Sequence, residues 1–419
     1  MNFIQTDSND KASPSCAASR GTAIAGRRVY YFSGFDPKGP RHYHRLYHGE
    51  AARQDAVSGQ NTFVGARRNV SKTCSHWEIT QHSCDKHQQT HTDYNFMRWD
   101  DIIRQHWHSN EFRLLIHLCY SLRVYLQRFA LFKVLVTSWP PFVTAMYPMC
   151  FLFLLLGLAT GLGLAIWSSA ALVWPLLLPA SLGVTVGVLW LGRLVEKKLN
   201  VYWLLRIYCF TARWGTGKCP EMEKRLDEFT DQIVRENREL PADEILLIGH
   251  SVGTMLATAV AARVFKHPDA TQDIKNRLSL LTLGHCVPVL SFISAAHGYR
   301  QELSTLAARA KHMSWVDFTA PTDGACFALI SPLTGCNRPE ALPEWPKLLS
   351  PRYATLFHPV TYQRIRRDRY RQHFQYLMAS ELPGDYDYFA ITAGNQTLAQ
   401  RFAHHKSVQQ FDKFKVFSK

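Results

Sequence analysis

A serine between two glycines carries the strongest chemical signal in this sequence, within the stretch EILLIGHSVG. The apolar run Glu244–Ile248 predicts a buried parallel strand, and the alanine-rich Thr254–Val264 predicts a helix. Gly249 and Gly253 allow the chain to turn sharply between these elements, which presents the hydroxyl of Ser251 at the N-terminus of the helix. A serine placed in this way can attack a carbonyl carbon when a neighbouring base takes its proton.

This strand, turn and helix resemble the nucleophile elbow of the α/β-hydrolase superfamily, most nearly its lipase-like members. The resemblance implies a mostly parallel sheet flanked by helices. It makes Ser251 the nucleophile, and Gly249, His250 and Gly253 the elbow around it. It also implies that an acid and then a histidine follow the serine along the chain, and that backbone N–H groups form an oxyanion hole.

The acid of such a site is expected just after a strand. The segment Lys311–Ala320 predicts a strand, and Asp323 lies in the loop that follows it. Asp323 is therefore the predicted acid. Asp317 is the rival, but its position inside the strand favours a structural hydrogen-bond role.

The base must be chosen from many histidines. His373, in RDRYRQHFQYLMAS, follows the acid and precedes a predicted terminal helix, so it matches the order that the resemblance implies. Five other histidines compete for the role: His285, His297, His358, His404 and His405.

The oxyanion hole requires two backbone N–H groups. Val252, directly after the serine, is expected to supply the first. The segment Arg27–Gly34 predicts an early strand that runs into a glycine-containing turn, so Gly34 or Phe35 is expected to supply the second. An ordinary β-turn is the alternative, because Asp-Pro and Gly form turns in any fold.

A long uncharged stretch interrupts this pattern. Val134–Gly192 contains no Asp, Glu, Lys or Arg, which is enough for two membrane spans of about 20 residues each. We expect the spans near Phe142–Trp167 and Ala171–Leu191; a helical hairpin buried in a soluble core is the alternative. The flanking residues Arg123, Arg128, Lys133, Arg193, Lys197, Lys198, Arg206 and Arg213 are positive on both sides, which places both ends in the cytoplasm.

Two crossings return the chain to its starting side, so segments before and after the hairpin can share one domain. We expect a disordered leader (1–27), a first part of the α/β domain (28–110), an interfacial helix with the hairpin (111–200) and a second part of the domain (201–419). Within the third region, Glu111–Val136 has apolar residues at helical spacing, and it suits either a membrane-interface helix or an amphipathic core helix.

The overall charge and the remaining motifs narrow the function. Lys and Arg number 48 against 33 acids, which suits an anionic membrane surface or a nucleic acid. No nucleic-acid module, P-loop or dinucleotide fingerprint is present, so neither nucleic acid nor a cofactor is expected. The cysteines and histidines between Cys74 and His91 fit no usual zinc spacing, so no metal is expected. The arginine-rich Gln363–Arg371 suits a solvated helix face or a phospholipid-headgroup contact.

Together these features predict a membrane-anchored serine hydrolase that cleaves a lipid or other acyl ester through an acyl-enzyme. An acyltransferase would use the same intermediate and differ only in the acceptor. A hydrolase-fold membrane scaffold with little turnover is the alternative from a different class.

Overall fold

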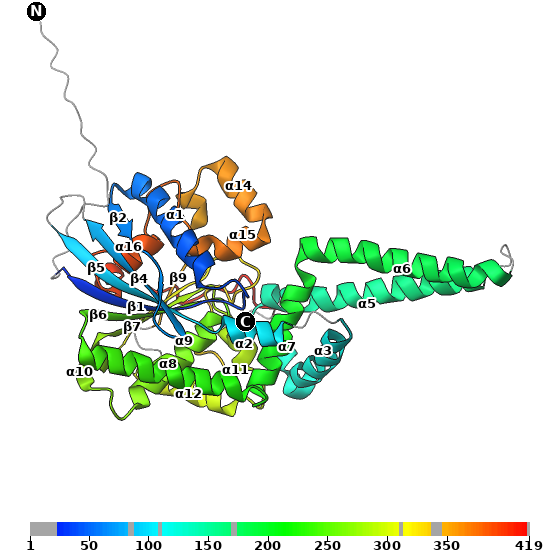
Figure 1. Ribbon diagram of the computed structural model, residues 1–419, viewed down its shortest axis with the longest axis horizontal. Coiled ribbons are helices and arrows are strands. Elements are labelled where there is room, and N and C mark those ends of the chain that lie inside the picture. Colours follow the sequence, from blue (N-terminus) through cyan, green and yellow to red (C-terminus); the bar gives the residue numbers. More distant parts are fainter. Residues whose placement is uncertain are drawn as a thin grey trace, which may run out of the picture.

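The computed structural model describes residues 23–82, 88–107, 111–168, 174–309, 313–336 and 346–416. The strands are β1 (Gly26–Phe32), β2 (Asn61–Val64), β3 (Arg68–Asn69), β4 (Cys74–His82), β5 (Gln89–Met97), β6 (Glu244–His250), β7 (Leu278–Leu283), β8 (Ser314–Phe318) and β9 (Lys347–Leu349). They form a nine-stranded sheet in the order β2-β4-β5-β1-β6-β7-β8-β9, with β3 paired to β4 (Figure 1).

Most of this sheet is parallel. The neighbours from β5 through β1 to β9 all run parallel, whereas β4 pairs antiparallel with β2, β3 and β5. Every residue of β6 and β7 is buried, as expected for strands covered on both faces. The predicted α/β class, with a largely parallel sheet flanked by helices, is confirmed.

Helices cover both faces of the sheet. One face carries α1 (Pro40–Ser58), α13 (Tyr353–Leu356), α14 (Pro359–Arg367), α15 (Arg369–Phe374), the 3₁₀ turn η4 (Gln375–Leu377), α16 (Tyr388–Ala393) and α17 (Leu398–Arg401). The other carries α2 (Asp100–His106), α7 (Val201–Gly215), α8 (Pro220–Glu239), α9 (Gly253–Lys266), α10 (Gln272–Arg277), α11 (Val287–Ser291) and α12 (His297–Arg309).

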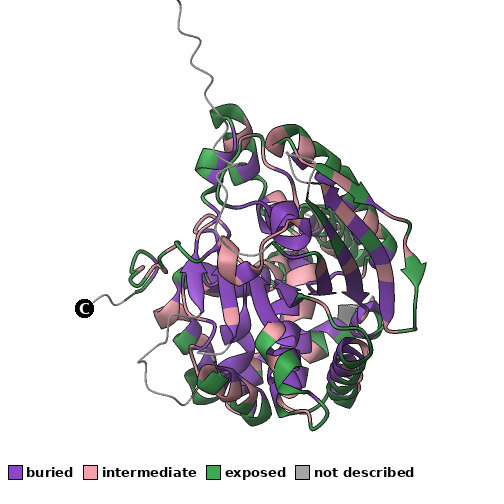
Figure 2. Cartoon of the chain, turned by 90° about the vertical axis from the view of Figure 1, so that its left-hand side faces the viewer, coloured by how far each residue is buried: buried purple, intermediate pink, exposed green. Residues whose placement is uncertain are grey.

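Alternation along β1 divides its side chains between two hydrophobic cores. Val29 and Tyr31 pack on the face covered by α1, while Tyr30 and Phe32 pack on the face covered by α8 and α9. In Figure 2 the buried sheet lies between helices whose outer surfaces are exposed. β1 begins at Gly26, inside the segment expected to be a leader; residues 1–22 of that expectation lie outside the described residues.

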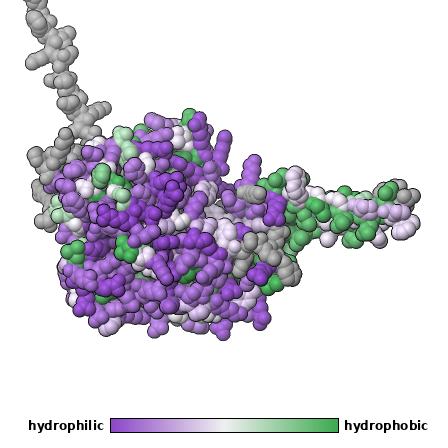
Figure 3. Space-filling model, in the orientation of Figure 1, coloured by the Kyte–Doolittle hydropathy of each residue, from purple (hydrophilic) through white to green (hydrophobic). Residues whose placement is uncertain are grey.

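A helical hairpin projects from the domain. It consists of α5 (Trp139–Trp167) and α6 (Trp174–Leu199), and both helices are long and apolar enough to cross a membrane. In the most apolar stretches of α5 and α6, only 17% and 6% of the residues are buried, so the hairpin does not form the core of the domain. Figure 3 shows it as an apolar arm on a largely hydrophilic body.

The helix boundaries differ from the predicted spans. α5 begins earlier than expected, at Trp139, because Pro140 and Pro141 are accommodated in its first turn, where their missing N–H groups cost no hydrogen bond. α6 continues beyond the predicted end, to Leu199. The predicted start of the second span, Ala171, lies outside the described residues.

Close contact between α5 and α6 depends on small residues. A Cβ atom on Gly163 would lie 2.7 Å from Thr185 Oγ1, and the hydroxyl of Ser181 donates a hydrogen bond to the Gly163 carbonyl at 2.8 Å. Small residues and interhelical hydrogen bonds are typical of helices that pack within a bilayer.

The expected single helix Glu111–Val136 is broken. It forms α3 (Glu111–Leu126), the 3₁₀ turn η2 (Gln127–Phe129) and α4 (Ala130–Thr137), and the break lies at the positive φ angles of Arg128 and Phe129. Leu114 and Leu118, on α3, are buried, whereas Phe129, at the break, is 74% exposed. The segment therefore combines features of a core helix and an interface helix.

Candidate active site

The adjacent strands β1 and β6 form a topological switch point in the middle of the sheet. They run parallel, but α1 follows β1 on one face and α9 follows β6 on the other. In open α/β sheets, ligands bind outside the carboxyl ends of strands at such a switch point. Gly34 follows β1 and Ser251 follows β6, so the predicted oxyanion loop and the predicted nucleophile meet here.

The turn that carries Ser251 is strained and tightly packed. Ser251 has a φ angle of 56°, in the left-handed region that residues with side chains rarely adopt. Its N–H donates to the Leu283 carbonyl at 2.9 Å, which ties the turn to the end of β7. A Cβ on Gly253 would lie 2.1 Å from the Phe32 carbonyl oxygen, and one on Gly249 would lie 2.6 Å from the Gly253 carbonyl oxygen. Both predicted elbow glycines are therefore required by backbone contacts.

The loop after β1 lies directly against the serine. A Cβ on Gly34 would lie 3.0 Å from Ser251 Cβ and 3.5 Å from Ser251 Oγ. Within the described chain, the N–H groups of Phe35 and Val252 donate no hydrogen bond to protein atoms. Free backbone donors on both sides of a serine are what an oxyanion hole requires.

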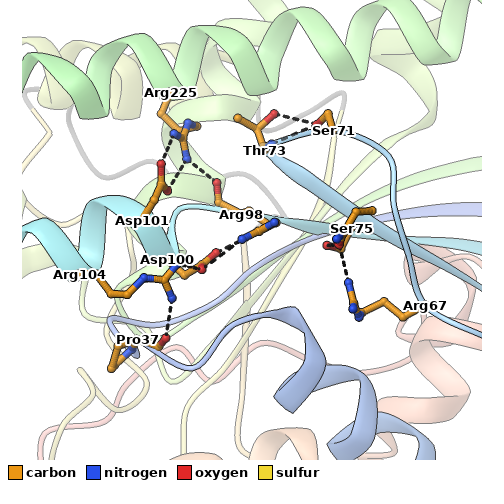
Figure 4. Close-up of polar contacts among 11 residues, drawn as sticks. Pro37, Arg67, Ser71, Thr73, Ser75, Arg98, Asp100, Asp101, Arg104 and Arg225 are labelled. Atoms are coloured by element: carbon orange, nitrogen blue, oxygen red, sulfur yellow. Dashed lines mark hydrogen bonds and ion pairs between the residues drawn. The ribbon is translucent and has the colours of Figure 1, made fainter.

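Side chains of α7 and α2 hold the same loop in place by donating hydrogen bonds to its carbonyl oxygens. The indole N–H of Trp203, on α7, donates to the Phe35 carbonyl at 2.6 Å, and Arg104 donates to the Pro37 carbonyl at 3.3 Å. Figure 4 shows Arg104 and Arg98 converging on Asp100, which is buried. Asp100 is the first residue of α2, and its ion pair with Arg104 connects α2 to the loop through the Pro37 carbonyl.

The structure brings the predicted base and acid together. Nδ1 of His373, on α15, lies 2.9 Å from a carboxylate oxygen of Asp323 in the loop after β8. Tyr376 donates to the same oxygen at 3.2 Å, and the Ala325 N–H donates to the other oxygen at 3.0 Å. Burial would raise the pKa of Asp323, but His373 and the Ala325 N–H outweigh burial and lower the pKa below its usual value.

His250, the residue before the serine, links β6 to the helix that carries the base. Its Nε2 lies 2.8 Å from the His373 carbonyl oxygen, so the proton of a neutral ring is placed there. Burial, assisted by the neighbouring His373, lowers the pKa of His250 to about 3. The sequence indicated an elbow residue at this position but did not indicate this link, nor the contacts of Tyr376 and Trp203.

The rival residues have other partners. Asp317 is buried and accepts a hydrogen bond from Thr282 at 2.6 Å, and burial raises its pKa well above the usual value. Nε2 of His285 bonds the Ile330 carbonyl at 2.8 Å and lies 3.8 Å from Asp317. Of the remaining competitors, His297 contacts Arg300, His405 lies 3.7 Å from Asp385, and His358 and His404 are exposed.

The site is closed. Ser251, Asp323 and His373 are only 8%, 3% and 6% exposed. Within the described chain, the Ser251 hydroxyl makes no hydrogen bond with His373 or any other residue. Access to the Ser251 hydroxyl, and a hydrogen bond between Ser251 and His373, therefore require some rearrangement.

A separate cluster could be mistaken for a metal site. His106 Nε2 lies 2.8 Å from Glu221 Oε1 and 3.8 Å from Cys219 Sγ, and all three atoms lie within 4.8 Å of one another. Burial raises the pKa of the Cys219 thiol to about 11, against an opposing effect of the Arg213 guanidinium. That guanidinium and the N-terminus of α8 would both repel a cation. A hydrogen bond between His106 and Glu221 explains the contacts without a metal. The histidine and cysteine run noted in the sequence lies partly outside the described residues.

Comparison with known proteins adds no assignment: no protein-family model, curated protein or solved structure matches this chain.

Proposed function

We propose that this protein is a membrane-anchored serine hydrolase of the α/β-hydrolase type, which cleaves a carboxylic ester of a lipid or another acyl compound. The observation that carries the proposal is the left-handed backbone conformation of Ser251 at the switch point. The 2.9 Å contact between His373 and Asp323 lies at the same carboxyl end of the sheet. The position of Gly34 against the serine supports it further.

The residues would act in two stages. Ser251 Oγ attacks the ester carbonyl while His373 takes its proton through Nε2, since Nδ1 faces Asp323. The N–H groups of Val252 and of Phe35 or Gly34 stabilise the negative oxygen. His373 then protonates the departing alcohol, and a water activated by the same histidine hydrolyses the acyl-enzyme. No cofactor takes part in these steps.

The membrane hairpin supports a lipid-like substrate. Thr144, on α5, donates a hydrogen bond to the Gly324 carbonyl at 2.7 Å, next to the acid. Trp203, just after the hairpin, contacts the loop of Phe35 and packs 5.6 Å from the ring of Tyr370 on α15. The domain end of the hairpin and Trp203 after it thus contact the segments that carry the proposed oxyanion donor, the acid and the catalytic histidine. An ester drawn from the cytoplasmic leaflet would reach these segments from the membrane side.

A second candidate follows from the closed site. Because Ser251 is 8% exposed and has no hydrogen bond to His373, a hydrolase-fold scaffold with little turnover would also fit these contacts. An acyltransferase shares the proposed first stage and would be distinguished by its acceptor.

The test is covalent labelling of the full chain, reconstituted in lipid, with a fluorophosphonate probe. Labelling should map to Ser251 by mass spectrometry and disappear in Ser251→Ala. Ser304→Ala, on α12, is the matched control and should label as the parent does. If folded protein in lipid is not labelled at Ser251, or if Ser251→Ala is labelled equally, the hydrolase proposal fails and the scaffold remains. A labelled protein would then be screened with lipid esters, with water and with alcohol acceptors.

A further inference from the structure

Four arginines without carboxylate partners gather on α14 and at the start of α15. Arg364, Arg366, Arg367 and Arg369 are all exposed, and none forms an ion pair within the described chain. The one acid in this segment, Asp368, accepts the Arg371 N–H at 2.9 Å as the cap of α15. Exposed basic side chains that are not neutralised locally make this the kind of surface that attracts anions.

These arginines lie beside the base of the membrane hairpin. The Arg369 guanidinium lies 6.0 Å from the centre of the Tyr147 ring on α5, and the Tyr147 hydroxyl donates to the Leu199 carbonyl at the end of α6 at 2.7 Å. In Figure 1, α14 and α15 lie on the part of the domain next to the base of α6. The contact with α5 therefore puts Arg369 at the level of Tyr147 along the hairpin.

The length of α5 indicates where the headgroups would lie. At about 1.5 Å per residue, the stretch from Tyr147 to Trp167 spans roughly 30 Å, which is the thickness of a bilayer hydrocarbon core. Tyrosine and tryptophan favour the two membrane interfaces. If the hydrocarbon core extends between these rings, Tyr147 lies at the cytoplasmic headgroup level, and Arg369 is beside it.

Other residues around the base fit the same level. Counting along α6, Trp174 and Arg193 are also separated by roughly 29 Å, which puts Arg193 near the same interface. On α4 and the turn before it, Phe129 and Phe132 are 74% and 52% exposed, and Lys133 follows them. Exposed aromatic rings beside basic residues are typical of segments that lie in the membrane interface.

We propose that Arg364, Arg366, Arg367 and Arg369 bind the phosphate groups of anionic phospholipids and dock this face of the domain on the cytoplasmic leaflet. Charge complementarity selects the occupant, because the cytoplasmic leaflet carries the anionic lipids and four unpaired guanidinium groups carry the opposite charge. Docking in this way depends on the hairpin spanning the bilayer but not on hydrolytic activity.

Hydrogen–deuterium exchange tests the docking directly. The full chain is placed in nanodiscs of phosphatidylcholine alone or of phosphatidylcholine with one-third phosphatidylserine. Backbone exchange across α14 and α15 should slow several-fold in the anionic discs, and added salt should reverse the effect. Arg364→Gln/Arg366→Gln/Arg367→Gln should lose the difference between the two lipids. The matched control is Arg235→Gln/Lys266→Gln/Lys275→Gln, on α8, α9 and α10, which should keep it. In Figure 1, α10 lies at the end of the domain away from the hairpin.

Three results would overturn the proposal. Exchange across α14 and α15 could be the same in both lipids. The control variant could lose the difference as fully as the α14 variant, which would indicate a general charge effect. Inorganic phosphate could give the same protection in neutral discs, which would indicate a small-anion site. None of these results depends on probe labelling, so they leave the hydrolase proposal to its own test.

Discussion

Two histidine–aspartate pairs lie on neighbouring segments at the carboxyl end of the sheet, and they differ in how each acid is held. In the first pair, His373 Nδ1 lies 2.9 Å from Asp323, whose other donors are Tyr376 and the Ala325 N–H. In the second, His285 lies 3.8 Å from Asp317, whose near partner is the Thr282 hydroxyl. Both acids are fully buried, so burial alone does not distinguish them.

The difference lies in which charge each site stabilises. The pKa of Asp323 is lowered, because the imidazole and the donors around it outweigh burial. The pKa of Asp317 is raised by burial, which its threonine donors do not offset. Burial also lowers the pKa of His285 to about 4, so its imidazole is neutral near pH 7. Only in the first pair do the surroundings favour the ionised acid that a catalytic histidine requires.

Replacing each acid by its amide should separate the pairs most clearly. Asp323→Asn should slow fluorophosphonate labelling of Ser251 by about 10⁴-fold, because the amide favours the wrong imidazole tautomer. Asp317→Asn should label within a few-fold of the parent, because burial already disfavours the charge that the amide removes. Rates are followed by gel fluorescence, and both variants are first checked for folding by circular dichroism. Equal losses in the two folded variants would remove the distinction.

The glycine between the two pairs offers a second comparison. Gly284 has a φ angle of 55°, and a Cβ there would lie 2.8 Å from the Tyr376 ring and 3.3 Å from an Asp323 oxygen. Gly284→Ala should displace the acid and slow labelling by about 100-fold, since a misplacement of about 1 Å can cost that much. Gly298→Ala, where a Cβ meets nothing within 4 Å, is the control. An unchanged labelling rate in Gly284→Ala would mean that the placement of Asp323 does not limit the reaction.

The sequence predicted which acid and histidine would meet because the reasoning depended on local features. Asp323 follows a strand and Asp317 lies within it, and the structure keeps that difference. The strand, turn and helix around Ser251 were likewise predictable, since alternation and glycine placement are local. The contacts of Tyr376, Trp203 and His250 depend on side chains brought together from distant segments, and no periodicity indicates them. The antiparallel pairing of β4 with β2, β3 and β5 was also beyond reach, because strand order is set by tertiary packing.

Removing single hydroxyls should give a smaller difference between the pairs. Tyr376→Phe deletes the donor 3.2 Å from Asp323 and should slow labelling about tenfold, since hydrogen bonds to charged groups contribute about 1.5–3 kcal/mol. Thr282→Val deletes the donor to Asp317 and should leave labelling unchanged while lowering the free energy of unfolding by about 1 kcal/mol. Stability is measured by denaturant unfolding in detergent. A slower reaction in Thr282→Val would implicate the second pair in the chemistry.

The pH dependence of stability gives the finest test, because the two acids should act in opposite directions. Asp323, with a lowered pKa, contributes stability above the unfolded value near 3.9, and this is lost as pH falls through the folded pKa. Asp317, with a raised pKa, costs stability as pH rises above about 3.9. Relative to the parent, Asp317→Asn should therefore gain stability as pH rises, and Asp323→Asn should lose it. Each unit of difference between the folded and unfolded pKa changes the free energy of unfolding by about 1.4 kcal/mol. This change is measured from unfolding midpoints across pH. Difference curves that slope the same way would show that the two acids share one charge state.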